Sequence, residues 1–233
     1  MTYLGISMIE RKIIYRGNEF KFYNELMALR QELTDDFLKT HPEFNGLTEL
    51  EILPPHTPGK MKGAMLFYNY DPEQMDYKNF SLDVTNKSVV KIADNVETMY
   101  PTAWNKIIKQ FPEITQAGYS VLYPHSVIRR HTGPENRSGK YIRVHIPVIV
   151  PNGDIGFEVA GEEVDWSDLF AFDNQRVHSA WNNTDHHRVV FIIDLPRSIC
   201  DLPDGTPWAW ELDEHTPAFP KGEKPLKEIH ENI

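Results

Sequence analysis

The sequence YIRVHIPVIV (141–150), followed by PNGD (151–154) and IGFEV (155–159), has the form of two β-strands joined by a turn. Apolar and β-branched residues dominate both strand segments, and the residues between them favour a turn. Further short segments of strand character lie on either side, at Tyr119–Tyr123, Leu169–Phe172, His178–Trp181 and Val189–Leu195. Short strands at such close intervals predict an antiparallel sandwich or barrel.

The chain before this region has helical periodicity. Apolar residues recur at helical spacing from Phe20 to Lys39, which predicts an amphipathic helix that ends before Pro42. A second helix is predicted to begin near Tyr100-Pro101, where proline is tolerated in the first turn, and to end at Phe111. Two more strands are predicted, at Ala64–Tyr70 and within Phe80–Val90. We therefore expect a mainly β protein with flanking helices.

The length and composition fit one globular domain. The chain has 233 residues, of which 40% are hydrophobic, and this is enough apolar material for a sizeable core. We expect a helical and strand support region over 1–115, the β core over 116–197 and a tail over 198–233 that packs on the core. Trp208 and Trp210 in this tail are expected to contact the barrel.

Charge and cysteine content exclude several classes of protein. A net charge of −10 argues against nucleic acid as a partner, although a few arginines can still hold a small anion. Cys200 is the only cysteine, so an internal disulfide is excluded and a reducing cytoplasm fits. The sequence lacks a run of 18 uncharged apolar residues, so we expect a cytoplasmic protein without a membrane partner. Its oligomeric state is not predicted.

Two histidines and an arginine form the candidate site. His131 and His178 both lie in a β-rich context, and Arg188 follows ten residues later in an apolar strand. Neutral imidazoles bind Fe(II) in oxygenases, and a guanidinium suits the carboxylate of a diacid cosubstrate such as 2-oxoglutarate. With ten histidines in the chain, spacing alone also fits two ordinary polar residues.

A third iron ligand is not evident. The acid of the usual iron-binding triad stands two residues after the first histidine, and in this sequence Gly133 occupies that position. Glu135 or Asp173 could supply the carboxylate instead. Otherwise His131 and His178 alone would hold the metal, with water or an anion in the remaining position.

The residues around His131, His178 and Arg188 resemble those of a known protein family. The resemblance covers roughly Tyr100 to Arg197 and rests on several segments in a fixed order: Tyr119–Pro124, Arg130–Asn136, Ile142–His145, Phe172–Asn174, His178–Asn182, Arg188 and Asp194. Together they resemble the aspartyl/asparaginyl β-hydroxylase family. The resemblance implies a double-stranded β-helix, which is a cupin-like jelly roll, and the use of Fe(II), 2-oxoglutarate and O2.

The resemblance also implies roles for individual residues. His131 and His178 match the family's iron ligands, and its best-known animal members also have glycine at the position of Gly133. Ser120 and Arg188 match the groups that hold the distal carboxylate of 2-oxoglutarate.

Arg143 and His145 match positions that face the 2-oxoglutarate 1-carboxylate or the substrate. Their separation of two residues places them on one face of a strand. The alternative for Arg143 is a solvated surface charge.

Some features depart from the family. The loop Arg137–Lys140 is longer than in the animal enzymes, and Asp165–Asp168 keeps the family's tryptophan but not the glycine and lysine after it. The helical repeat domain of the animal members is not expected here, which weakens the case for a folded protein substrate. Three other histidines, His125, His186 and His187, are expected to be exposed.

Three functions remain open at this point. The first is hydroxylation of an unactivated carbon in an amino-acid-like substrate, which is either a free small molecule or carrier-bound. The second is halogenation, with chloride bound in the position that Gly133 leaves vacant. A non-catalytic ligand-binding protein with the same fold is the third.

Overall fold

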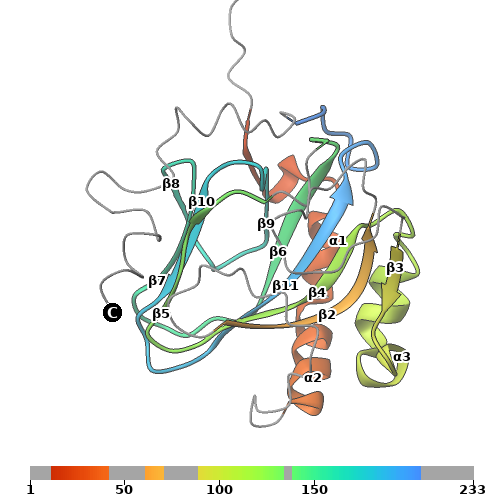
Figure 1. The fold of residues 1–233 in the computed structure, drawn as a ribbon, viewed down its shortest axis with the longest axis horizontal. Coiled ribbons are helices and arrows are strands. Elements are labelled where there is room, and N and C mark those ends of the chain that lie inside the picture. Colours follow the sequence, from red (N-terminus) through yellow and green to blue (C-terminus); the bar gives the residue numbers. More distant parts are fainter. Residues whose placement is uncertain (1–11, 42–60, 71–88, 134–137, 206–233) are drawn as a thin grey trace, which may run out of the picture.

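The computed structural model describes residues 12–41, 61–70, 89–133 and 138–205. Its strands form two antiparallel sheets that face each other (Figure 1). The larger sheet has the order β1 (Ile14–Arg16), β9 (Phe170–Phe172), β6 (Tyr141–Ile149), β11 (Arg188–Pro196), β4 (Gln116–Leu122), β2 (Met61–Tyr70), β3 (Val89–Ile92). The smaller sheet has the order β5 (Ser126–His131), β10 (His178–Asn182), β7 (Ile155–Val159), β8 (Glu162–Val164).

From β4 onward the chain passes back and forth between the two sheets. Strands β4, β6, β9 and β11 belong to the larger sheet, whereas β5, β7, β8 and β10 belong to the smaller one. This winding is that of a double-stranded β-helix, so the expected fold class is confirmed.

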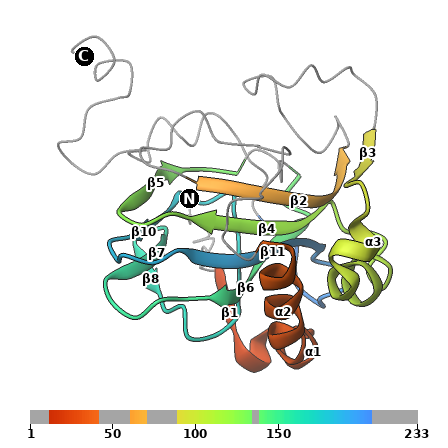
Figure 2. The ribbon, with the colours of Figure 1, turned by 90° about the horizontal axis from the view of Figure 1, so that it is seen from below.

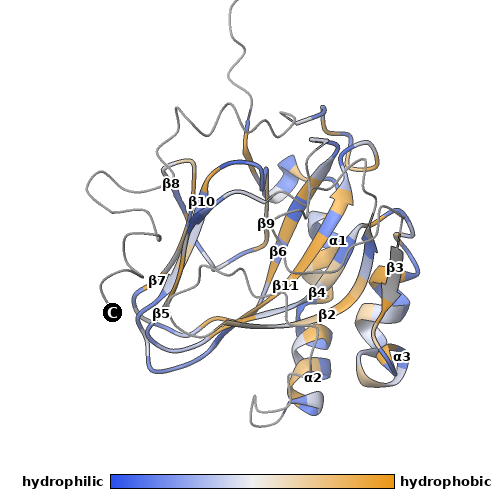
Figure 3. Cartoon of the chain, viewed as in Figure 1, coloured by the Kyte–Doolittle hydropathy of each residue, from blue (hydrophilic) through white to orange (hydrophobic). Residues whose placement is uncertain are grey.

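Alternation along the central strands creates two separate apolar regions. The side chains that point between the sheets line a space that we call the barrel interior; its buried apolar members are Ile14, Leu122, Phe157, Val159, Val164, Trp166, Phe170, Phe172, Ala180 and Val190. Intervening residues of β11 and β6, such as Phe191 and Ile146, point the other way into a core that we call the helix-facing core. In Figure 3 the central strands of the larger sheet are strongly apolar, in agreement with burial on both faces.

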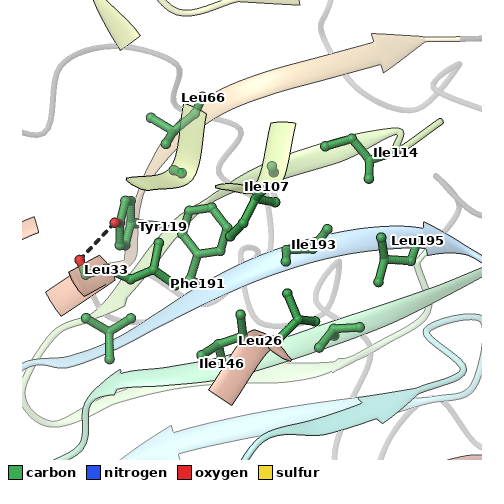
Figure 4. Packing of buried hydrophobic residues seen from close by; sticks show 14 of the residues in the cluster. Leu26, Leu33, Leu66, Ile107, Ile114, Tyr119, Ile146, Phe191, Ile193 and Leu195 are labelled. Carbon is green, nitrogen blue, oxygen red and sulfur yellow. Dashed lines mark hydrogen bonds between the residues drawn. The ribbon is translucent and has the colours of Figure 1, made fainter. Parts of the chain in front are cut away.

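The helices cover the outer face of the larger sheet (Figure 2). They are the 3₁₀ helix η1 (Gly17–Glu19), α1 (Tyr23–Ala28), α2 (Arg30–Thr40), α3 (Val96–Met99) and the π-helix η2 (Ala103–Ile108). Leu26 of α1 and Leu33 of α2 pack onto Ile146 and Phe191, and the Tyr119 hydroxyl donates a hydrogen bond to the Leu33 carbonyl oxygen at 2.9 Å (Figure 4).

Both predicted helices are present with altered boundaries. The expected helix Phe20–Lys39 is divided at Leu29, whose N–H bonds the carbonyl oxygen of Leu26 three residues back. The second predicted helix begins at Pro101, as expected, after the separate short helix α3, and most of it is a π-helix in which the Lys109 N–H bonds the Trp104 carbonyl oxygen five residues back. Among the described residues, no helix has the length and apolar character needed to cross a membrane.

The strand predictions were incomplete. β1 and β8 have three residues each, too few for a period-two pattern. β5 was missed because polar residues occupy four of its six positions. Part of the predicted strand Phe80–Val90 and the tail residues Trp208 and Trp210 lie outside the described residues.

We expect Phe191→Ala to lower the free energy of unfolding by about 3–5 kcal/mol, because it leaves a cavity in the helix-facing core. Phe191 is fully buried and its ring meets Tyr119 edge-on at 4.7 Å between centroids. Urea unfolding monitored by circular dichroism measures the change. As a control, Ile92→Ala on the exposed edge strand should cost less than about 0.5 kcal/mol. Equal losses in the two variants would contradict this core.

Candidate active site

The two candidate iron ligands lie opposite each other on neighbouring strands of the smaller sheet. His131 ends β5, His178 begins β10, and the two residues are paired in the antiparallel register. Their ring centroids are 4.2 Å apart. The His178 ring also contacts Phe157 and Phe172, so it points into the barrel interior. Two residues far apart in the sequence are therefore brought together as predicted.

The ring of His178 has a defined tautomer. Its Nδ1 lies 2.8 Å from the carbonyl oxygen of Arg176. A carbonyl can only accept, so Nδ1 carries the proton and Nε2 has the lone pair that a metal requires. Burial lowers the pKa of His178 well below its usual value, and His131 lowers it further. A neutral imidazole of this kind is suited to a metal ion.

The space beside Gly133 is filled by Asn174. A Cβ atom placed on Gly133 would lie 2.3 Å from Asn174 Nδ2 and 3.0 Å from the Asn174 carbonyl oxygen. The Gly133 N–H also donates a hydrogen bond to that carbonyl oxygen, at 2.6 Å. Gly133 thus permits a close contact with the loop between β9 and β10, and a side chain at position 133 would need Asn174 to move.

Of the two carboxylates suggested as a third iron ligand, Asp173 pairs with an arginine instead. Asp173 forms a buried ion pair with Arg197, with 3.2 Å between Oδ2 and Nη2. Glu135 lies outside the described residues. Among the residues that are described, no three histidine, cysteine or acidic side chains are grouped so as to hold a metal.

Arg188 is a buried cation in the barrel interior. It is 1% exposed, and its guanidinium carbon lies 4.8 Å from the centre of the Trp166 ring. Its Nε and Nη2 atoms have no hydrogen-bond acceptor among the described residues. Burial lowers the pKa of Arg188 to about 9. A guanidinium in this condition is stabilised by an anion that binds between the sheets.

Ser120 lies on the same face of the sheet as Arg188. The two strands pair so that Ser120 is opposite Val190 and Leu122 is opposite Arg188. Leu122 and Val190 belong to the barrel interior, and residues two apart in a strand share a face, so Ser120 and Arg188 are diagonal neighbours there. The predicted pair is therefore brought together.

Arg143 and His145 share the inner face of β6, as their spacing predicted, but their surroundings differ. Arg143 donates two hydrogen bonds to Asp194, from Nε to Oδ1 at 2.8 Å and from Nη2 to Oδ2 at 2.7 Å. Its Nη2 also lies 3.4 Å from Gln116 Oε1. Arg143 is buried, so the alternative of a solvated surface charge is wrong.

His145 lies among aromatic rings. Its ring is stacked on Trp166 at 5.8 Å with an interplanar angle of 7°, and Phe157, Phe170 and Phe172 surround it. Burial lowers the pKa of His145 well below its usual value, and the charges of Arg188 and Arg143 lower it further. A neutral His145 therefore lines the barrel interior next to Trp166, whose ring also contacts Arg188.

Three residues that sequence reasoning did not assign also contribute. Trp166 lies against both Arg188 and His145, Asp194 pairs with Arg143, and Asn174 contacts Gly133. The spacing of Arg188 and Asp194 along one strand could have placed Asp194 on the inner face.

The three histidines that were expected to be exposed have surroundings unlike those of His131 and His178. His125 is exposed and pairs with Asp185 at 3.0 Å, and His186 is exposed too. His187 is half-buried with its ring against Tyr123, so the expectation of exposure was wrong for this residue.

Comparison of the sequence with known proteins identifies the protein family. Residues 59–198 match the family model described as aspartyl/asparaginyl beta-hydroxylase. Because the match covers more than half of the chain, the protein belongs to this family.

Individual relatives are more distant. An ornithine lipid ester-linked acyl 2-hydroxylase from Rhizobium tropici is 29% identical over 158 residues, which are 63% of this chain and 54% of that protein. The human aspartyl/asparaginyl beta-hydroxylase is 28% identical over 96 residues, which are 38% of this chain and 12% of the human protein. The chain therefore matches about half of the first relative and a small part of the second.

One solved structure is described as an oxidoreductase of the 2OG-Fe(II) oxygenase family from Burkholderia pseudomallei. The similarity has a TM-score of 0.39 at 10% identity and covers 68% of this chain and 77% of that one.

We expect Gly133→Ala to destabilise the protein by about 1–3 kcal/mol, because its new methyl group would overlap Asn174. Gly63→Ala is the matched control, since a Cβ there would meet only the Tyr119 carbonyl oxygen at an ordinary 3.5 Å. Urea unfolding of both variants measures the difference. A Gly133→Ala protein as stable as Gly63→Ala would show that the contact with Asn174 is not tight.

Proposed function

We propose that this protein is an Fe(II)- and 2-oxoglutarate-dependent hydroxylase that acts on an amino-acid-like substrate, either free or carrier-bound. One observation carries the proposal: the barrel interior holds two histidine rings in contact together with a guanidinium that has no carboxylate among the described residues. The family to which the chain belongs supports the same reaction class.

The residues fit the metal that the proposal requires. His131 and His178 would hold Fe(II), with Nε2 of His178 as one donor and the Arg176 carbonyl fixing the orientation of its ring. Each histidine comes from a different strand, and the cross-strand pairing of these strands sets the separation of the rings. Two protein ligands leave coordination positions for a chelating cosubstrate and O2.

The residues around Arg188 fit a diacid. Arg188 would donate two hydrogen bonds to the distal carboxylate of 2-oxoglutarate, and the Ser120 hydroxyl would donate a third. Trp166 and the phenylalanine rings beside it exclude water from this region, which strengthens the charge-assisted bonds. Arg143 and His145 would lie nearer the reacting end, where Asp194 holds the Arg143 side chain in place.

When bound, Fe(II), 2-oxoglutarate and O2 together supply the oxidation, in which one oxygen atom enters a substrate C–H bond and 2-oxoglutarate becomes succinate and CO2. The protein would position the reactants and keep the interior dry. Asn174 occupies the direction in which a side chain at position 133 would point, so we do not carry halogenation forward as a second proposal.

An anaerobic titration with Fe(II) and 2-oxoglutarate, followed by a substrate screen that measures succinate, tests the proposal. The screen includes free amino acids, carrier-bound amino acids and an ornithine lipid, since one relative bears the name of an ornithine lipid hydroxylase. Mass analysis with and without chloride separates hydroxylated from halogenated products. Binding of 2-oxoglutarate without turnover of any substrate would instead favour a ligand-binding protein.

We expect His131→Ala and His178→Ala to lose Fe(II) binding while the fold is retained, because each removes one of only two proposed protein ligands. His125→Ala is the control, since His125 is exposed and distant from the paired histidines. Anaerobic Fe(II) titration and circular dichroism measure the two properties. Full iron binding by either ligand variant would disprove the assignment.

For Arg188→Met we expect 2-oxoglutarate binding to weaken by about 2–5 kcal/mol, because a buried charged hydrogen bond is lost. Without 2-oxoglutarate, the variant should unfold at a higher temperature than the wild type, since a buried cation without a bound anion is removed. Arg16→Ala, on the surface, is the control for both measurements. Unchanged 2-oxoglutarate affinity would place the cosubstrate elsewhere.

A further inference from the structure

The loop between β9 and β10, residues 173–177, contacts the candidate ligand His178 and the backbone that follows the candidate ligand His131. At one point the Asn174 carbonyl oxygen accepts the Gly133 N–H at 2.6 Å, two residues after His131. At another point the Arg176 carbonyl oxygen accepts Nδ1–H of His178 at 2.8 Å. A shift of this loop would therefore alter the backbone beside one histidine and the ring of the other.

The loop is held from its opposite side by a buried ion pair. Asp173 and Arg197 lie 3.2 Å apart, and both side chains are almost completely buried. Within the loop, the Arg176 N–H donates to the Asp173 carbonyl oxygen at 3.0 Å. The Asp173 N–H donates to the carbonyl oxygen of Ile13, just before β1, at 2.9 Å. Asp173 thus connects the loop to two other parts of the chain.

Arg197 has little freedom to move. Its Nε donates to the Tyr141 carbonyl oxygen at 3.1 Å, and its Nη1 donates to the Pro203 carbonyl oxygen at 3.2 Å. Gly205 packs so closely against the guanidinium that a Cβ there would lie 2.9 Å from Nη2. The position of this cation is therefore fixed by the start of β6 and by the segment that follows β11.

We propose that Asp173 and Arg197 are positioning residues, which hold the 173–177 loop so that His131 and His178 are oriented to bind a metal. This inference rests on the proposed function. A buried polar loop adopts one conformation only when its polar groups have fixed partners. The ion pair supplies such a partner at the start of the loop, and the two carbonyl contacts transmit its position to the histidines.

The test is the affinity for Co²⁺ alone, measured anaerobically from its visible absorption, without 2-oxoglutarate or substrate. The main variant is the double substitution Asp173→Asn with Arg197→Met, which removes both charges and leaves neither one buried without its partner. We expect its Co²⁺ affinity to fall about 10-fold, the lower end of the effect of residues that orient metal ligands.

Tyr119→Phe is the matched control. It also removes one buried side-chain contact, the hydrogen bond to Leu33, but in the helix-facing core on the other side of the sheet. Its Co²⁺ affinity should equal that of the wild type. Thermal unfolding of each variant separates a general loss of stability from a loss of metal affinity.

Each outcome has a defined meaning. If the wild type does not bind Co²⁺, or if His178→Ala binds it equally well, the proposed function fails and the role of the ion pair fails with it. If the wild type binds through His178 and the double variant binds with the same affinity, only the positioning role is overturned.

A measurement on the wild type decides the matter if the double variant does not fold. Coupling is reciprocal, so Co²⁺ binding should slow hydrogen exchange in peptides that cover residues 197–205. Peptides from α2 should not change. Unaltered exchange over 197–205 in the metal-bound protein would overturn the proposal.

Discussion

Alternation along β11 determines how the interior of this protein is divided. Arg188, Val190 and Asp194 point between the sheets, whereas Phe191 and Ile193 point toward the helices. A shift of one residue in the pairing would exchange the two sets and bury charged groups in the helix-facing core. The cost of burying unpaired charges is large, so the apolar pattern that forms the core also fixes where the charged groups of the site lie.

Three arginines are buried in the part of the chain that the structure describes, and their partners distinguish them. Arg143 has Asp194, and Arg197 has Asp173 together with two backbone carbonyls. Arg188 has the face of an indole ring but no carboxylate among the described residues. Burial alone would make all three equal candidates for an anion site. The presence or absence of an internal carboxylate selects Arg188 as the one suited to an external diacid.

The sequence predicted those features that depend on local pattern. Period two along β6 placed Arg143 and His145 on one face, and the order of motifs identified His131, His178 and Arg188 as one set. Features that depend on the pairing of distant strands could not be predicted in this way. Asp194 reaches Arg143 because β6 and β11 are neighbours in one register, and Asn174 reaches Gly133 through a loop contact without sequence periodicity.

Because Gly133 has no side chain, the orientation of the two proposed metal ligands depends more strongly on the 173–177 loop. In a site with three protein ligands, each ligand restrains the metal, and a small error in one ring has a limited effect. Under the proposed function only two rings hold the metal, so their orientation depends on the groups behind them. Here those groups are the carbonyls of Asn174 and Arg176, which belong to one loop. Glycine at position 133 is what allows this loop to approach so closely, so the missing carboxylate and the tight loop contact are two consequences of the same residue.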